Sequence, residues 1–235
     1  MIKILTWNIH RSHRAWEYLL NKICPDIALL QEVPRNILES EAIIGKAIDP
    51  ARPWGSAIWT NGFTVEEIPF GRDPGWVCAA HIKLTRATSL IAVSIHTKLI
   101  GDAKTGTQKN HVFPHLDYII DDVSRMVAGS KFIVGGDLNS CRLIDKYNSP
   151  SAYPIPNRHG VFFDRIESNG YFNCHRKFHP NEEQTFFGSG QPYQDDHLFV
   201  SYNLTKHVKS CQVLTAPAKA KISEHAPLIA EVMVG

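Results

Sequence analysis

Asp137 and Asn139 are the first residues in this chain whose types and spacing suit chemistry. They lie in Gly135-Gly136-Asp137-Leu138-Asn139-Ser140, directly after the apolar run Phe132-Ile133-Val134. Two residues apart at the end of a strand, their side chains point the same way. The carboxylate could hold a water molecule, the amide could donate to an anionic oxygen, and the two glycines would let a large anionic group approach the backbone. An Asx turn that ends a strand uses the same residues, so the segment alone leaves both interpretations open.

Other polar residues of the types used in metal-assisted hydrolysis stand at the ends of predicted strands. They are Asn8, Glu32, His96, Asp196, Glu224 and His225. A single polar residue in such a position is usually a turn former, so none of them indicates a site by itself. Together, they indicate a hydrolytic site assembled where several strands end.

The elements that must position these residues are strands that alternate with a few helices. Apolar runs predict strands at residues 2–7, 27–30, 56–60, 63–68, 77–84, 89–96, from 132, 195–201, 208–214 and 227–234. Helical spacing predicts helices at residues 14–24, 37–47 and 111–127, the last of them after Pro114. Prolines mark residues 148–159 as a loop rather than a linker between domains, because strand signals resume on both sides.

This element order suits two packed sheets flanked by helices. At 235 residues the chain is expected to form a single domain, residues 1–235, with one large core. We see no close repeat, only a rough similarity of layout between the halves. With 43% hydrophobic residues and a net charge of +2, the composition is that of an ordinary soluble protein and neither supports nor excludes a polyanionic substrate.

The cysteines bear on the compartment. They are scattered, odd in number and nowhere paired as CxxC: Cys24, Cys78, Cys141, Cys174 and Cys211. This pattern favours free thiols in a reducing compartment over a disulfide scaffold or a thiolate zinc site. No apolar stretch approaches the ~18 residues needed to span a membrane. We therefore expect a cytoplasmic protein without a membrane anchor, whose oligomeric state the sequence leaves open.

Six segments, in order, resemble the motifs of the endonuclease/exonuclease/phosphatase superfamily, and together they cover residues 4 to 233. They are Thr6-Trp7-Asn8-Ile9-His10, Leu29-Leu30-Gln31-Glu32-Val33, Ser94-Ile95-His96-Thr97, Gly135-Gly136-Asp137-Leu138-Asn139-Ser140, Asp196-His197-Leu198-Phe199-Val200-Ser201 and Ser223-Glu224-His225-Ala226-Pro227-Leu228. The resemblance implies an α/β (α+β) fold: a four-layer αββα sandwich of two packed, mixed, mostly antiparallel sheets flanked by helices. It also implies phosphoester hydrolysis, but nucleases, sphingomyelinases and inositol polyphosphate phosphatases share it.

The resemblance further implies a metal site and a catalytic base. Glu32 is similar to the principal metal ligand of the superfamily, with Asn8 beside it touching the metal or the phosphate. Such hard oxygen ligands suit Mg²⁺ or Mn²⁺. Asp137 would orient and deprotonate the attacking water, and Asn139 would hold a phosphate oxygen or that water.

Two histidines complete the implied catalytic set. His225, held by Asp196, would donate to the phosphate as charge builds up, since a neighbouring carboxylate keeps an imidazole charged at neutral pH. His96 would serve as a general acid on the leaving-group side, as in the branch that resembles pancreatic deoxyribonuclease and the sphingomyelinases.

Three positions depart from the superfamily pattern. Glu224 replaces the usual aspartate before His225, so this carboxylate, which we expect to reach the metal, is longer by one methylene. His96 stands where the abasic-site branch has tyrosine, which argues against a dedicated abasic-site enzyme. In Gln194-Asp195-Asp196 the usual basic residue is missing; Asp195 is either a solvated neighbour or the residue that orients the histidine in place of Asp196.

Evidence for the substrate comes from aromatic and basic residues. Phe186 lies where nuclease relatives carry aromatics near a nucleotide, although a buried strand is the simpler explanation. Two clusters could contact phosphates or simply be solvated: Arg11, His13 and Arg14, and Lys98, Lys104 and Lys109. We interpret the pair His111 and His115 as structural, and His175 with His179 as part of a basic loop rather than a zinc site.

We therefore predict a Mg²⁺-dependent phosphodiesterase, an endonuclease of low sequence specificity on DNA or RNA. The alternative is a phosphatase or phosphodiesterase acting on a phospholipid, inositol phosphate or nucleotide derivative. A third reading, a binding protein that keeps the fold without the chemistry, fits the near-complete residue set less well. A nuclease needs an open cleft flanked by cations, whereas an enzyme for a small substrate needs a closed pocket.

Overall fold

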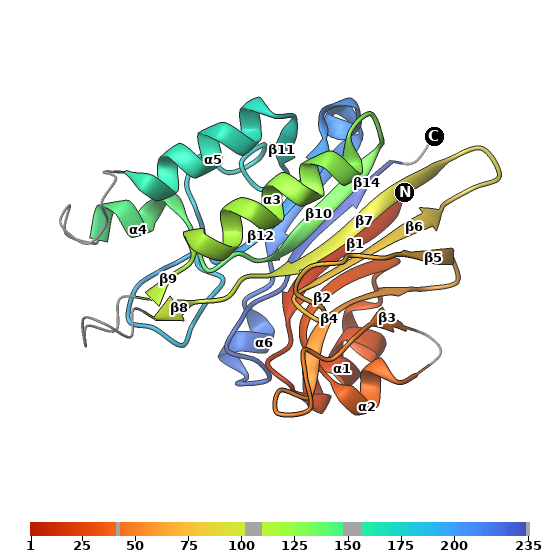
Figure 1. The fold of residues 1–235 in the computed structure, drawn as a ribbon, viewed down its shortest axis with the longest axis horizontal. Coiled ribbons are helices and arrows are strands. Elements are labelled where there is room, and N and C mark those ends of the chain that lie inside the picture. Colours follow the sequence, from red (N-terminus) through yellow and green to blue (C-terminus); the bar gives the residue numbers. More distant parts are fainter. Residues whose placement is uncertain (41–42, 102–109, 148–156, 234–235) are drawn as a thin grey trace.

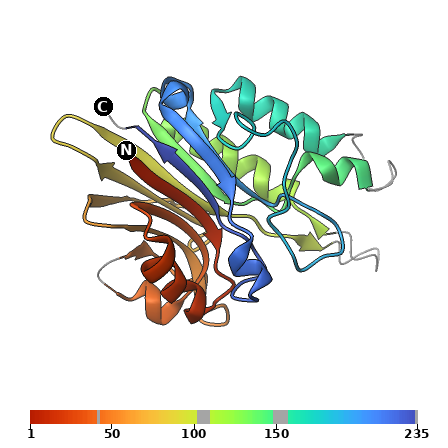
Figure 2. The ribbon, with the colours of Figure 1, turned by 180° about the vertical axis from the view of Figure 1, so that it is seen from behind.

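Two six-stranded sheets form the centre of the computed structural model, which describes residues 1–40, 43–101, 110–147 and 157–233 (Figure 1). In the first sheet only β1 and β2 run parallel; the other neighbours are antiparallel. Its strands, in spatial order, are β13 (Val208–Val213), β14 (Leu228–Val232), β1 (Ile2–Asn8), β2 (Ile27–Pro34), β4 (Trp54–Thr60) and β3 (Ile43–Gly45). The first and last strands of the chain, β1 and β14, are therefore neighbours, red beside blue in Figure 2.

The second sheet repeats this layout, again with one parallel pair, β7 and β10. Its strands, in spatial order, are β11 (Tyr171–Asn173), β12 (Asp196–Ser201), β10 (Phe132–Asp137), β7 (Ser89–His96), β6 (Val77–Lys83) and β5 (Thr64–Ile68). A separate two-stranded ladder joins β8 (Ile100–Gly101) to β9 (Asn110–His111). The rough similarity between halves is thus a strand, a helical crossover and a parallel strand at the centre of each sheet.

Helices cover the outer face of each sheet, which makes the four-layer αββα sandwich (Figure 1). On the side of the first sheet are α1 (His13–Tyr18), the π-helical turn η1 (Leu19–Ile23) and α2 (Arg35–Leu38). On the side of the second are α3 (Phe113–Val127), α4 (Arg142–Tyr147) and α5 (Arg158–Ser168). The short helix α6 (Ala216–Lys219) and the 3-10 helix η3 (Tyr202–His207) connect the C-terminal strands. No helix in the described part of the chain is long and apolar enough to cross a lipid bilayer.

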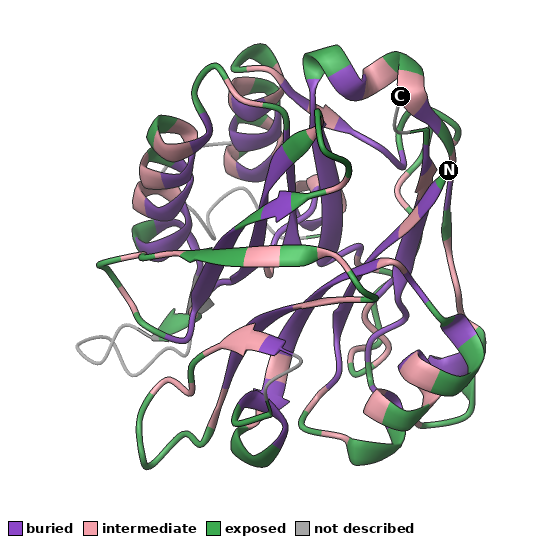
Figure 3. Cartoon of the chain, turned by 90° about the vertical axis from the view of Figure 1, so that its right-hand side faces the viewer, coloured by how far each residue is buried: buried purple, intermediate pink, exposed green. Residues whose placement is uncertain are grey.

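The apolar side chains form three layers, one between the sheets and one beneath each set of helices. Figure 3 shows in purple the buried positions along the strands of both sheets. Between the sheets, Leu29 of the first packs in the same cluster as Ile133 and Leu198 of the second. Strand β10 is buried at all six positions because its two faces are covered by different layers. On the outer face, α3 presents Leu116 and Ile120 at helical spacing to the second sheet.

Polar contacts also join the two sheets close to the functional residues. Gln31 Nε2 of β2 donates to Ser94 Oγ of β7 at 2.9 Å, and that hydroxyl donates to the carbonyl of Leu30 at 2.8 Å. All these atoms are buried, so each hydrogen bond replaces water that the layer excludes. The hydrogen bonds fix the position of one sheet on the other at this point.

Two expectations about elements were wrong. The helix predicted for residues 37–47 ends at Leu38, and Ile43–Gly45 instead forms the edge strand β3 against β4, as suits two β-branched residues in succession. The segment before residue 148 and the one after residue 157 are the helices α4 and α5, not strands. The apolar residues of α5 include Phe162 and Ile166, four apart, which contact the second sheet as one helical face.

Candidate active site

The polar strand ends meet at Asp137, the last residue of β10. In the ladders of the second sheet, Asp137 is the partner of His96 on the parallel strand β7 and of Asp196 on the antiparallel strand β12. Asn8, which ends β1, reaches it from the other sheet: its Nδ2 donates to Asp137 Oδ2 at 3.0 Å. The fold therefore brings four of the residues selected from the sequence together at one end of both sheets, where these strands terminate.

Asp137 is almost fully buried and is surrounded by donors. Its Oδ1 accepts the backbone N–H of Asn139 at 3.0 Å, and its Oδ2 lies 3.7 Å from His225 Nε2 and 3.8 Å from His96 Nε2. Burial raises the pKa of Asp137, and the positive charge of His225 opposes this effect. A carboxylate whose pKa is raised in this way is a stronger base than one in water.

His225 lies between two carboxylates. Its Nδ1 is 2.8 Å from Asp196 Oδ2, and Asp196 is fully buried. Although burial lowers the pKa of His225, the carboxylates of Asp196 and Asp137 outweigh it and raise that pKa to about 10. His225 is therefore an imidazolium at neutral pH, with Nδ1–H donated to Asp196 and Nε2–H directed toward Asp137.

A short polar network holds the His225 backbone against β1. Ser223 Oγ donates to the carbonyl of Asn8 at 2.8 Å and accepts the N–H of His225 at 3.1 Å. The indole N–H of Trp7 donates to the carbonyl of His225 at 2.8 Å. These two residues lie in the quoted motifs, but only the structure shows that they position the histidine.

Asp195 does not take the orienting role, which belongs geometrically to Asp196. Nor is it a solvated neighbour: it is buried in the wall of the cleft, where its Oδ1 has no hydrogen-bond partner among the described residues. Burial raises its pKa, and the charge of Asp137 adds to the effect. Asp195 is thus an additional acidic group of the site.

Glu32 turns toward the cleft through an irregularity in β2. Its φ is 50°, and the ladder with β4 shifts register between Leu30 and Val33. One oxygen of its carboxylate accepts Asn8 Nδ2 at 3.3 Å, and the other lies 3.1 Å from Arg11 Nε. Arg11 thus contacts the predicted metal ligand.

The acidic residues of the cleft fit a hard divalent cation. Glu32, Asp137, Asp195 and Glu224 all line it, and their oxygens are the ligands that Mg²⁺ and Mn²⁺ prefer. The charge of Asp137 raises the pKa of Asp195, so a cation in the cleft would relieve the repulsion between these two carboxyl groups. Glu32 lies beside the amide of Asn8, as expected for the predicted metal ligand.

His96 differs from the general acid expected from the sequence. Its ring is buried between two indoles, with centroids 5.4 Å from Trp54 and 5.0 Å from Trp76. Burial lowers the pKa of His96 to about 4, even though the charge of Asp137 raises it. At neutral pH His96 is a neutral imidazole, and its buried Nδ1 has no hydrogen-bond partner among the described residues.

The two glycines before Asp137 serve the sheet rather than an approaching anion. A Cβ on Gly136, whose φ is 155°, would lie 1.8 Å from the carbonyl oxygen of Ile95. A Cβ on Gly135 would lie 3.0 Å from the carbonyl oxygen of His197. Both positions are buried between neighbouring strands, so the glycines allow β7, β10 and β12 to approach closely.

Asn139 belongs both to the turn after β10 and to the lining of the cleft. It adopts a φ of 47°, its N–H caps Asp137, and its Nδ2 donates to the carbonyl of Thr97 at 3.1 Å. It also lines the cleft. The Asx turn and a functional role are therefore both compatible with this residue.

The cleft has a volume of about 470 Å³ and is lined by aromatic and basic as well as acidic groups. Phe186 stands beside His225, with the centroids of the two rings 4.9 Å apart. Lys98 pairs with Asp73 and lies 5.2 Å from the ring centroid of Trp76. Arg52 and Trp76 also line the cleft, although no motif in the sequence marks either residue.

The members of the two basic clusters predicted to contact phosphates do not all lie at the cleft. Arg14 is exposed on α1 and does not line the cleft, and His13 lies 3.4 Å from the Asn36 amide. Lys104 and Lys109 lie outside the described residues. His115 accepts the N–H of Lys98 at 3.0 Å; the side chain of His111 is not described.

The whole chain resembles solved nuclease structures. An AP endonuclease from Archaeoglobus fulgidus matches with a TM-score of 0.74 and 18% identity over 100% of both chains. The 3' phosphatase NExo from Neisseria, bound to a product DNA hairpin, gives 0.73 and 18% over 100% of both chains. AP endonuclease LMAP from Leishmania major gives 0.70 and 15%, covering 100% of this chain and 88% of its own.

These likenesses show the endonuclease/exonuclease/phosphatase fold, as the motifs predicted. No protein-family model matches the chain, and no curated protein matches its sequence. The closer resemblance to the pancreatic deoxyribonuclease and sphingomyelinase branch stays a prediction.

Proposed function

We propose that the protein is a divalent-metal-dependent phosphodiesterase that cleaves nucleic acid, as an endonuclease of low sequence specificity. The observation that carries this proposal is the position of Asp137 Oδ2, within 3.0 Å of Asn8 Nδ2 and 3.7 Å of His225 Nε2. A buried base, an amide donor and an imidazolium thus surround one point at the edge of the cleft. This combination suits attack of water on a phosphate ester, where negative charge grows as a proton leaves the water.

Each residue of the chain has a distinct task in this reaction. Asp137 accepts the proton of the attacking water on the oxygen that faces the cleft. The Nε2–H of His225 donates to a phosphate oxygen as charge accumulates there, while Asp196 keeps the ring charged and correctly turned. The amide of Asn8 orients Asp137.

Mg²⁺ or Mn²⁺ held by Glu32, with Asn8 beside it and Glu224 on the cleft wall, would supply neutralisation of phosphate charge. His96, neutral and held between Trp54 and Trp76, donates a hydrogen bond on the side of the leaving group. The leaving oxygen then takes its proton from solvent, because the pKa of about 4 leaves His96 without a proton to give at pH 7.

The groups around the cleft support a polymeric substrate. Arg52, Lys98 and Arg11 place positive charge near the acidic centre, where phosphates on either side of the scissile bond would lie. Trp76 and Phe186 present aromatic rings in the same cleft, on which bases can stack. The similar structures include AP endonucleases and a 3' phosphatase bound to product DNA, which agrees with nucleic acid as the substrate.

We also propose that the protein is cytoplasmic. All five cysteines are free and four of them are buried. This agrees with a reducing, cytoplasmic environment.

A substrate panel tests the proposal. Plasmid DNA, single-stranded RNA, a phosphoinositide and an aryl phosphodiester are each incubated with the protein and Mg²⁺, with Asp137→Asn as the matched inactive variant. We expect cleavage of nucleic acid by the wild type and a loss of about 10³-fold or more in the variant. Turnover confined to the phosphoinositide would instead support the small-substrate alternative, and equal activity of both proteins would refute the assignment of Asp137.

A further inference from the structure

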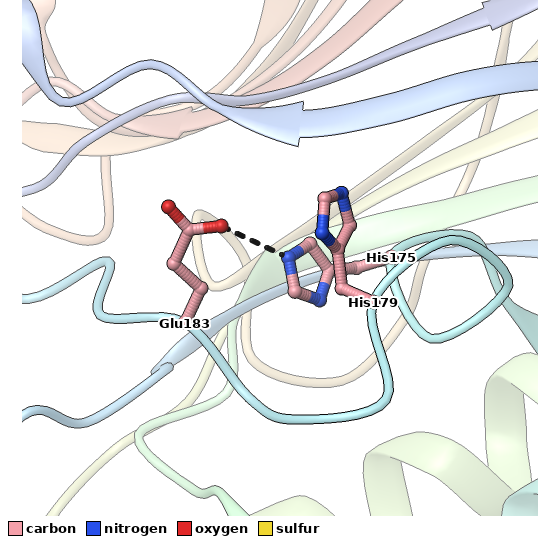
Figure 4. Close-up of side chains that lie close together, drawn as sticks. All are labelled: His175, His179 and Glu183. Carbon is pink, nitrogen blue, oxygen red and sulfur yellow. Dashed lines mark hydrogen bonds and ion pairs between the residues drawn. The ribbon is translucent and has the colours of Figure 1, made fainter.

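Three metal-ligating side chains outside the cleft converge on the turn that follows β11: His175, His179 and Glu183 (Figure 4). The N–H groups of Phe178 and His179 both donate to the carbonyl of His175 at 3.0 Å, which closes one helical turn. Residues four apart on such a turn project from the same side. The two imidazoles accordingly stack with centroids 4.4 Å apart and an interplanar angle of 17°.

The donor atoms are close enough for one ion to reach all three. Glu183 Oε2 lies 3.3 Å from His175 Nε2, and one ligand atom from each of the three residues lies within 4.8 Å of the other two. Metal–ligand bonds of about 2.0–2.2 Å in a tetrahedral site place neighbouring donors about 3.4 Å apart. The lone pair of an imidazole lies in the plane of its ring, so at least one ring must turn out of the stack before both histidines bind the same ion.

The hydrogen bond of His179 prepares it as a ligand. Its Nε2 lies 2.9 Å from the carbonyl oxygen of Cys211, which can only accept, so Nε2 carries the proton. The lone pair of the ring is then on Nδ1, which has no hydrogen-bond partner among the described residues. Metal-bound histidines usually donate their second nitrogen to a carbonyl or a carboxylate in this way.

The backbone around the three ligands is fixed independently of them. Asn173 Oδ1 accepts the N–H of His175 at 3.0 Å, and Gln194 Oε1 accepts that of Glu183 at 2.9 Å. The neighbouring Glu182 carboxylate accepts the first two N–H groups of α4, from Arg142 and Leu143. His175 is fully buried, whereas the Glu183 side chain is 45% exposed, so an ion can enter from one side.

We propose that His175, His179 and Glu183 form a second, structural metal site for a divalent transition-metal ion, zinc in the first instance, with water as the fourth ligand. Two imidazoles and one carboxylate suit Zn²⁺, whereas the carboxylates of the cleft suit Mg²⁺. No ligand of the proposed site lines the cleft. In this proposal His175 and His179 are metal ligands, whereas the sequence led us to interpret them as part of a basic loop.

Cobalt binding tests this site by a readout that does not depend on activity. The chelator-treated protein is titrated with Co²⁺ in excess Mg²⁺, and the visible bands of nitrogen-ligated cobalt are followed. Cys24, the exposed thiol, is replaced by serine in every protein so that it does not bind the ion. Zn²⁺ competition and melting curves with and without Zn²⁺ complete the comparison.

Four variants distinguish the proposed site from other binding. His179→Ala and Glu183→Gln should weaken Co²⁺ affinity at least tenfold and abolish the rise in melting temperature with Zn²⁺. Glu32→Gln, in the cleft, and His81→Ala, an exposed histidine on β6, should bind one equivalent like the wild type. Circular dichroism without metal confirms that the variants fold. Unchanged cobalt binding in both site variants, no binding by the wild type, or binding lost only in Glu32→Gln would overturn the proposal.

Discussion

Asp137 and Asp196 face each other as partners in the antiparallel ladder of β10 and β12, and His225 contacts both carboxylates. Its Nδ1 lies 2.8 Å from Asp196 and its Nε2 lies 3.7 Å from Asp137. Asp196 therefore holds the Nδ1–H of the histidine, while Asp137 faces its Nε2–H on the opposite side of the ring. Several expected outcomes depend on this arrangement.

Replacing Asp196 with asparagine should move the alkaline limit of activity. In the wild type the rate should fall on the acid side as Asp137 is protonated, and on the alkaline side as pH rises through the His225 pKa of about 10. Asp196→Asn removes the strongest cause that raises this pKa, so the alkaline limb should shift to lower pH. The pH–rate profile measures this shift. If the alkaline fall in rate does not move, it is caused by the ionisation of a group other than His225.

The ion pair between His225 and Asp196 should stabilise the fold in a pH-dependent way. The folded pKa of His225 is raised above the unfolded value of about 6.5, so its contribution is complete below pH ~6.5 and is lost as pH rises through about 10. Removing one partner of a buried pair costs about 3–5 kcal/mol. Urea unfolding at pH 7 and at pH 10 should show a larger loss for Asp196→Asn at pH 7, and an equal loss at both values would contradict this linkage.

His96 should act as a neutral donor. Because its pKa is about 4, the pH–rate profile should show no ionisation of this residue between pH 5 and 8. His96→Gln, which retains a donor, should keep more activity than His96→Ala, with a loss of about 100-fold for alanine. A pH–rate profile that shows an ionisation near pH 6.5 in the wild type, but not in His96→Gln, would instead support the general-acid assignment.

Gly136 should not tolerate a side chain. The Cβ of Gly136→Ala would overlap the carbonyl oxygen of Ile95 at 1.8 Å, so β7 and β10 would have to separate. We expect a loss of about 3–5 kcal/mol in the free energy of unfolding. Gly71→Ala, where nothing lies within 4 Å of the new Cβ, is the matched control and should change stability little.

Basic residues of the cleft should contribute to substrate affinity and to its salt dependence. Arg52→Ala and Lys98→Ala should raise KM for nucleic acid several-fold, and each lost phosphate contact should reduce the slope of log affinity against log salt by about 1. Arg14→Ala, in the exposed part of α1, should leave both quantities unchanged. A larger effect for Arg14 than for Arg52 would place the nucleic acid on a different face.

The sequence was most informative where chemistry and strand ends coincide. Asn8, Asp137 and Asp196 could be selected from the sequence because each is a polar residue at the end of a predicted strand. Pairing of neighbouring strands brings such ends to the same side of a sheet. The neutrality of His96 could not be predicted, since it depends on Trp54 and Trp76, far away in the chain.

Other errors had local causes. The β-branched residues Ile43 and Ile44 satisfied a helical pattern, but pairing with β4 decided their conformation. Arg52 enters the cleft from a loop that carries no motif.

The hydrogen bond between Asn8 and Asp137 crosses from one sheet to the other, just as Gln31 bonds to Ser94 across the same gap. The layer of apolar side chains between the sheets therefore acts as a spacer that sets the distance between Asn8 and Glu32 on one sheet and Asp137 on the other. Changes of side-chain volume at Leu29 or Ile133 would alter this distance without replacing any residue of the candidate site. The interior packing of this protein thus sets the geometry of its candidate site.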